Sequence, residues 1–211
     1  MRQGQNLNQR NRTRRALIEG ALAVMRRGAL PSVAEAAQIA GVSRANAYRY
    51  FPDSSSLVAA VLDETVRPHE FEAVAPTLPP DPRVRVERFL DDALAILEAH
   101  APQLRVALRL ALQQDADGNP GVVPNVGRGT RLRYLASALE PLRDEVDPQE
   151  FSRAIAALAL VVGIEAQIVL RDLCALDEEQ ADDVVRWTCG IIVDAISERA
   201  RPPAEESDRP A

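Results

Sequence analysis

The sequence predicts an all-α protein, and three observations support this fold class. Alanine and leucine dominate a composition that is 46% apolar and 27% charged, whereas aromatic residues, which strands favour, make up only 4%. Apolar residues recur three and four positions apart, the spacing of one buried helix face. Residues 31–51 are typical of two short helices joined by a tight turn. We therefore expect an N-terminal three-helix helix-turn-helix domain followed by a C-terminal helical bundle.

The first helix is expected to begin at Asn11 or Thr13, after a polar and mobile segment of residues 1–9. Residues 26–28, Arg-Arg-Gly, end it, because cations suit the negative end of a helix. Four arginines between positions 10 and 15 lie at the opposite end, where the helix dipole disfavours them. Contact with phosphates explains that cluster better than local helix energetics. The buried face consists of Leu17, Ile18, Ala21, Leu22 and Met25.

Capping residues delimit the two short helices that follow. Ser32 is a candidate N-cap, and Glu35 three residues later completes a capping-box pattern. Gly41 ends the helix, since glycine reaches the left-handed conformation that a helix C-terminus often needs. Ser43 is the candidate N-cap of the second helix.

The second helix is expected over residues 44–50, because the residue before Pro52 avoids the α region. Asp53 or Ser54 then caps a helix that runs to about Arg67, and the free N–H groups at its start are a ready anion site. Three apolar residues of this region are expected in the hydrophobic core: Ile39, Val42 and Phe51.

The rest of the chain predicts a helical bundle behind a proline-rich linker. Four prolines between Ala75 and Pro82 exclude the interior of a helix there. Amphipathic helices follow over most of residues 84–142, with a Gly/Pro loop at residues 115–124. The last two helices are predicted at about residues 149–172 and 178–199.

The first of these two helices is nearly all apolar from Ala154 to Leu170. A membrane span needs about 20 apolar residues, and the central carboxylate of Glu165 is costly in a bilayer. We therefore expect a helix buried between other helices. Because both helices carry more apolar surface than one core needs, we also expect a homodimer through them, as a four-helix contact across a two-fold axis.

Charge divides the chain into a basic head and an acidic body. Residues 1–60 hold nine arginines against three acidic residues, which gives a net charge of +6. The remainder carries −12, so the whole chain carries −6. This asymmetry predicts that the head, and not the body, meets a polyanion. We expect domains at residues 1–66 and 67–201, followed by a disordered tail at residues 202–211.

The two cysteines, Cys174 and Cys189, are expected to be reduced and to act as small apolar packing residues. A redox switch is the less favoured alternative. The N-terminal residues lack the apolar region of a signal peptide, which predicts a cytoplasmic location. His69 and His100 have no cysteine or histidine nearby at ligand spacing, so we expect neither a metal nor another cofactor.

The segment I-A-G-V-S-R-A-N-A-Y-R-Y-F-P at residues 39–52, followed by S-x-L-V, resembles the TetR (tetracycline-repressor-like) family of transcriptional regulators. The resemblance covers about Arg12 to Leu62, and beyond that it is one of helical architecture. It implies a homodimer on a palindromic operator in double-stranded DNA, usually a repressor that a small-molecule effector releases. The chain departs from the family pattern at Ser54, where lysine is common, and at Ala47, where a larger aliphatic residue is usual.

By this resemblance, residues 43–50 hold the recognition helix and its aromatic and polar contacts. Their chemistry agrees, since Arg44 can pair with guanine O6/N7 and Asn46 with adenine N6/N7, each worth about 1–3 kcal/mol of discrimination. The hydroxyls of Tyr48 and Tyr50 suit phosphates, although Tyr48 can equally pack against the first helix. The expected DNA-binding residues are Arg12, Arg14, Ser32, Ser43, Arg44, Ala45, Asn46, Tyr48, Arg49, Tyr50 and Ser54.

A carboxylate in an apolar run needs a partner, and Glu165 is the one such residue in the body. One hypothesis places it in an effector pocket that takes a cation. The alternatives are hydrogen bonding, an arginine partner at the dimer interface, or simple exposure. The candidate pocket residues are Leu104, Leu108, Glu165 and Trp187, although a core position is the favoured interpretation for the tryptophan.

Two other classes of function fit the sequence less well. A helical-bundle enzyme is disfavoured, because the sequence holds no metal-spaced His/Glu set, no G-x-S-x-G and no phosphate-binding glycine loop. A scaffold does not explain the basic head, and the acidic body argues against an anionic membrane surface. We therefore expect a regulator that is not an enzyme and has no membrane partner.

Overall fold

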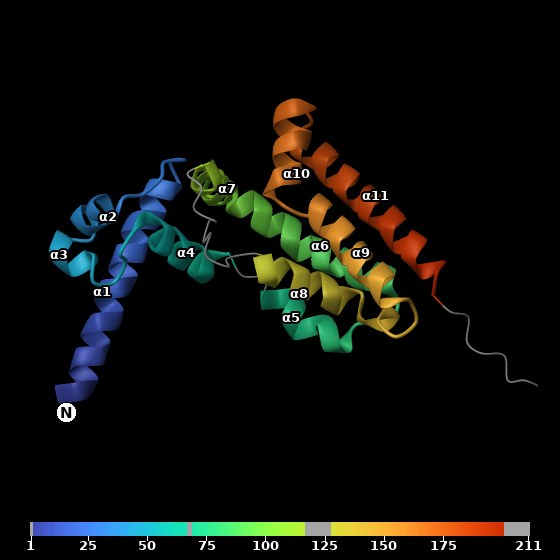
Figure 1. The fold of residues 1–211 in the computed structure, drawn as a ribbon, viewed down its shortest axis with the longest axis horizontal. Helices are drawn as coiled ribbons and strands as arrows, with labels where there is room; N and C mark the ends of the chain where they lie inside the picture. The colour runs from blue at the N-terminus through green and yellow to red at the C-terminus, as the bar shows by residue number, and fades with distance from the viewer. Residues whose placement is uncertain (1, 67–68, 117–127, 201–211) are drawn as a thin grey trace, which may run out of the picture. The chain divides into compact units, whose positions relative to one another are not determined.

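The computed structural model describes residues 2–66, 69–116 and 128–200, and the regular structure in these ranges is entirely helical (Figure 1). The all-α prediction is therefore confirmed. The predicted tail at residues 202–211 lies outside the described residues, as does most of the predicted loop at residues 115–124.

The chain forms two compact units. The N-terminal unit consists of Met1–Arg67 and Glu98–Gly127, and the C-terminal unit consists of Pro68–Leu97 and Arg128–Ala211. The chain thus returns to the N-terminal unit after residue 97, which the single expected boundary after residue 66 did not include. The assignment of separate functions to the two parts stays a prediction.

The N-terminal unit is built on α1, Arg2–Met25, which contacts α2, α4 and α7. Val106 and Leu110 of α7 share one hydrophobic cluster with Leu17 of α1 and Leu57 of α4, so α7 belongs to this core. The other helices of the unit are α2, Val33–Ile39; α3, Arg44–Ala47; α4, Ser54–Thr65; and α7, Ala101–Ala116.

Three predicted capping features of the N-terminal unit are confirmed. The hydroxyl of Ser32 accepts a hydrogen bond from the backbone N–H of Glu35 at 3.0 Å. Ser43 caps α3 in the same way, and Gly41 adopts a left-handed φ of 65° after α2. These contacts join residues three positions apart or less, which is why the sequence indicates them.

Three details of this unit differ from expectation. Helix α1 begins at Arg2 instead of Asn11 or Thr13, since no proline interrupts the polar residues before it. Helix α3 ends at Ala47, and the next residues form turns with i to i−3 hydrogen bonds that tighten the chain before Pro52. The side chain of Ile39 is 48% exposed and therefore lies outside the core.

The C-terminal unit is a bundle in which α9 contacts α8 and α11 (Figure 1). Sequence periodicity did not indicate its short first helix, α5. Its helices are α5, His69–Val74; η1, Ala75–Thr77; α6, Pro82–Ala99; α8, Arg128–Ala138; η2, Glu140–Leu142; α9, Pro148–Val161; α10, Ile164–Ile168; the π-helical turn η3, Val169–Leu173; and α11, Glu178–Ser197.

The proline-rich stretch at residues 75–82 belongs to the C-terminal unit and does not connect the two units. A buried arginine, Arg85, holds it in place. The guanidinium donates to the carbonyl oxygens of Ala75 and Leu78 at 2.9 and 3.4 Å. It also donates to those of Ser137 and Ala138 at 2.8 and 3.1 Å, so one side chain joins this stretch to the end of α8.

The helix predicted at about residues 149–172 is interrupted. Helix α9 ends at Val161, and α10 begins after Gly163. Arg131 of α8 lies against Gly163 and donates to the carbonyl of Ala159 at 3.1 Å, so a Cβ at position 163 would overlap its guanidinium. Among the described residues no single helix has the length and hydropathy of a membrane span. Helix α9 and residues 164–173 reach that length and hydropathy only when they are taken together, and the chain bends by 43° between them.

Two residues expected to be buried are exposed. Trp187 on α11 has an exposed fraction of 66%, so its core position is wrong. Cys174 is also exposed, whereas Cys189 is buried as expected. Helical periodicity marks an apolar face, but it does not show whether another helix of the same chain covers that face.

Replacing Gly20 with alanine is expected to destabilise the N-terminal unit by about 1–2 kcal/mol, although alanine favours helices by about 1 kcal/mol. A Cβ at this position would lie 2.8 Å from the backbone oxygen of Ala36, which cannot move without separating α1 from α2. The matched control is Gly190→Ala on α11, whose Cβ would meet only the flexible end of Arg83. Chemical denaturation should show a lower free energy of unfolding for Gly20→Ala and not for Gly190→Ala. Equal stabilisation of the protein by both substitutions would contradict the expectation.

Burial raises the pKa of the Cys189 thiol to about 12, and the charge of Glu87 adds to the effect. We therefore expect Cys189 to stay protonated and unreactive toward a disulfide reagent at pH 8 until the protein unfolds. The Cys174→Ala variant isolates this thiol, since the chain has only two cysteines. Rapid reaction of folded Cys174→Ala would show that Cys189 is accessible.

Candidate nucleic-acid interface

The start of α3 presents polar side chains to solvent. Ser43, Arg44 and Ala45 are exposed, and Asn46 is half-buried. On the opposite side Ala47 is fully buried in the core and fixes the orientation of the helix. A small residue at this position lets α3 lie close to the core, and the exposed residues of its first turn face outward together.

The residues after α3 extend the same surface. Tyr48 is 49% exposed, so about half of its side chain can reach an external partner. Arg49 is exposed, and Tyr50 is half-buried against the hydrophobic core. These side chains reach solvent because the chain continues in tight turns after Ala47.

The start of α4 is less suited to anions than expected. The carboxylate of Asp53 accepts a hydrogen bond from the N–H of Ser56 at 2.7 Å and completes a capping box. The protein's own negative charge therefore occupies this helix end. Ser54 is the first residue of α4 and is half-buried, while Ser32 is exposed and its hydroxyl accepts the α2 cap.

The arginines of α1 have different surroundings. Arg14 forms an ion pair with Glu64 of α4, and its guanidinium lies 5.8 Å from the centre of the Phe51 ring. It thus joins α1 to α4. Arg12 is exposed, and in the described parts of the chain it forms no ion pair, nor do Arg44 and Arg49. These three cations are available to an external anion.

The candidate effector residues are divided between the two units. Leu104 and Leu108 are half-buried on α7 of the N-terminal unit. Glu165 and Trp187 belong to the C-terminal unit, and both are exposed. The carboxylate of Glu165 lies 3.3 Å from the guanidinium of Arg131, which agrees with the arginine-pair alternative and not with a cation pocket.

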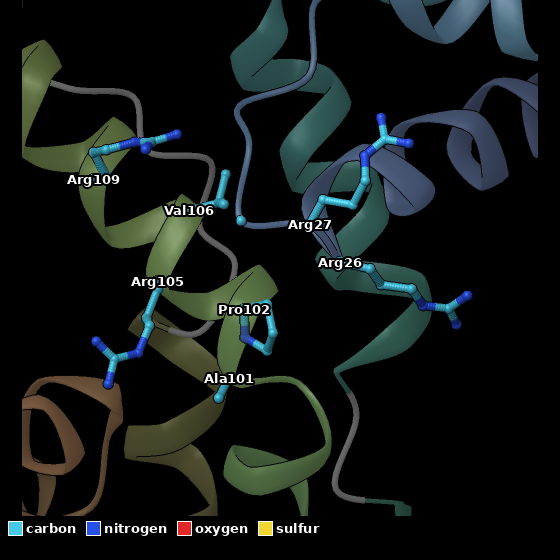
Figure 2. A pocket seen from close by; sticks show the side chains of 8 residues that line it. Arg26, Arg27, Ala101, Pro102, Arg105, Val106 and Arg109 are labelled. Carbon is cyan, nitrogen blue, oxygen red and sulfur yellow. The ribbon is translucent and has the colours of Figure 1, made fainter. Parts of the chain in front are cut away.

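A groove that the sequence did not indicate lies within the N-terminal unit, between the end of α1 and the first turns of α7 (Figure 2). Its volume is about 500 Å³. The apolar part of its lining comes from Gly28, Ala101, Pro102 and Val106. Four arginines complete it: Arg26, Arg27, Arg105 and Arg109. The sequence indicates only the doublet at residues 26–27, as a helix end, because the groove depends on α7 packing beside α1.

Comparison of the chain with protein-family models, with curated proteins and with solved structures found no match.

Proposed function

We propose that the protein is a sequence-specific, DNA-binding transcriptional regulator that binds a palindromic operator as a homodimer and is released by a small-molecule effector. The supporting observation is the exposed polar surface of α3, oriented by the buried Ala47 and flanked by arginines without ion pairs in the described chain. The resemblance of residues 39–52 to the TetR family supports the same proposal, with repression as the expected mode.

The side chains divide into base readers and phosphate contacts. Arg44 and Asn46 lie two positions apart in the first turn of α3. Their side chains are the ones suited to hydrogen bonds with base edges. Tyr48, Arg49 and Arg12 suit phosphates, which fix register without reading sequence. Arg14, held by Glu64, contributes by joining α1 to α4 instead of by direct contact.

An exposed apolar surface on α9–α11 supports the homodimer. Its large side chains are, with their exposed fractions, Leu160 78%, Val169 49%, Leu173 79%, Trp187 66% and Ile191 48%. A second copy related by a two-fold axis would cover the same surface on both chains. The η3 turn and the exposed part of α11 would then be shielded from water.

Replacing Leu160 with glutamate is expected to convert the proposed dimer to a monomer, because a charge would be buried within the proposed interface. Sedimentation at fixed protein concentration measures the change, and the emission of Trp187 should shift to longer wavelength. The matched control is Leu112→Glu on α7, whose side chain is 63% exposed in the other unit. A dimer that survives Leu160→Glu, or that Leu112→Glu also dissociates, would contradict this interface.

The function is tested by binding of the full chain to the promoter upstream of its own gene and to a scrambled duplex of equal composition. A regulator should prefer the promoter, and its affinity should fall steeply with salt because phosphate contacts release counterions. Equal affinity for both duplexes, or no binding, would reject the proposal.

A further inference from the structure

Four arginines line the groove at the end of α1, and the described part of its lining contains no acidic residue. Arg26 and Arg109 form no ion pair within the described ranges, and Arg27 has only a weak, exposed pair with Glu35 at 3.7 Å. The first turn of α7, which forms one wall, contains no acidic residue, so the positive end of its dipole adds to the field.

The positive charge of Arg26 also affects a neighbouring histidine. His100 directly precedes α7, and its pKa is lowered by burial and, to a lesser extent, by the charge of Arg26. Both effects favour the neutral imidazole near neutral pH. The groove therefore has no proton-dependent cation at this end, and its charge comes from arginines that stay protonated.

The inner surface of the groove is apolar. Val106 is only 2% exposed and belongs to the core of the unit, and Pro102 and Ala101 lie beside it. Gly28 has a φ of +73°, and a Cβ there would meet no atom within 4 Å, so the space beside it is open. Figure 2 shows Arg109 extending from α7 toward the end of α1, whereas the guanidinium groups of Arg26, Arg27 and Arg105 point away from the space between the two helices.

We propose that this groove binds an amphipathic organic anion, an apolar body that carries a carboxylate, sulfonate or phosphate. The apolar body would lie against Val106 and Pro102, and the anionic group would meet Arg109. The exposed side chains of Arg26 and Arg27 would turn toward the bound anion. The volume of about 500 Å³ lies within the range of small-molecule sites. The anion replaces the cationic effector that Glu165 suggested from the sequence.

A small anion fits this groove better than the DNA backbone does. Arg26 lies fourteen residues beyond Arg12 on α1 and in the turn that follows it, about 21 Å along the helix axis. A phosphate backbone has no apolar body to cover Val106. That the anion is the effector rests on the proposed function. A ligand in this groove would contact α1 and α7; α1 packs against α2, and α2 in turn contacts α3, which carries the proposed base-reading residues.

The test uses the full chain and two probes that share an aromatic body, 8-anilinonaphthalene-1-sulfonate and the uncharged N-phenyl-1-naphthylamine. The Arg26→Gln/Arg109→Gln variant should bind the sulfonate about tenfold more weakly and bind the neutral probe with little change. The charge-matched control is Arg15→Gln/Arg153→Gln, two exposed arginines outside the groove. Ala101→Trp keeps the arginines but fills the groove, so it should weaken both probes.

Equal loss in the groove variant and in the control would show an effect of net charge alone and overturn the proposal. Unchanged sulfonate affinity in both Arg26→Gln/Arg109→Gln and Ala101→Trp would place the probe elsewhere and also overturn it. Displacement of the sulfonate by a short scrambled duplex would assign the groove to DNA instead. Because these measurements contain no operator, failure of the DNA-binding proposal leaves their outcome unaffected.

Discussion

Replacing Arg85 with methionine is expected to lower the free energy of unfolding of the C-terminal unit by about 3–5 kcal/mol, since a buried acceptor left without a donor costs about 1–3 kcal/mol. Arg85 is 7% exposed, and the described chain offers its guanidinium no carboxylate. Its binding partners are four backbone carbonyls, on residues 75, 78, 137 and 138. Methionine would fill part of the volume but would leave these acceptors buried without a donor, which costs far more than the hydrogen bonds contribute net.

Urea denaturation followed by far-ultraviolet circular dichroism measures this loss. The protein concentration is held fixed, because the stability of the proposed dimer would depend on it. Arg85→Lys should recover only part of it, since one ammonium cannot span four carbonyls. The control is Arg153→Met, an exposed arginine paired with Glu150, for which we expect less than about 1 kcal/mol. A loss below about 1 kcal/mol for Arg85→Met would show that water replaces the missing donors.

Replacing Arg44 or Asn46 with alanine is expected to reduce the preference for the operator over scrambled DNA by about 1–3 kcal/mol each, or about 5- to 150-fold. Both side chains lie at the start of α3, outside the contacts that hold the helix, so the fold should survive. Competition binding with the two duplexes measures the preference, and circular dichroism checks the fold.

Arg12→Gln is the comparison variant for this experiment. Because glutamine cannot neutralise a phosphate, this variant should bind both duplexes more weakly to the same extent, and the slope of log affinity against log salt should fall by about 1. Arg44→Ala should instead act mainly on the operator. If Arg44→Ala weakens both duplexes equally, Arg44 is a phosphate contact, and base reading must lie with other residues.

The interrupted helix at Gly163 shows where sequence patterns stop being informative. The apolar run from Ala154 to Leu170 correctly predicts helix on both sides of the break. The break itself depends on Arg131, more than thirty residues earlier, whose guanidinium lies against Gly163. A pattern of neighbouring residues contains no information on which distant side chain approaches them.

The sequence by itself determined the all-α class and the caps at Ser32 and Ser43, because each cap joins a side chain to a backbone N–H three residues away. Only the tertiary structure decided that α7 packs with α1, that Arg14 pairs with Glu64 and that Trp187 is exposed. The basic groove belongs to this second group. Its walls are about eighty residues apart in the chain, and packing alone brings their arginines to one surface.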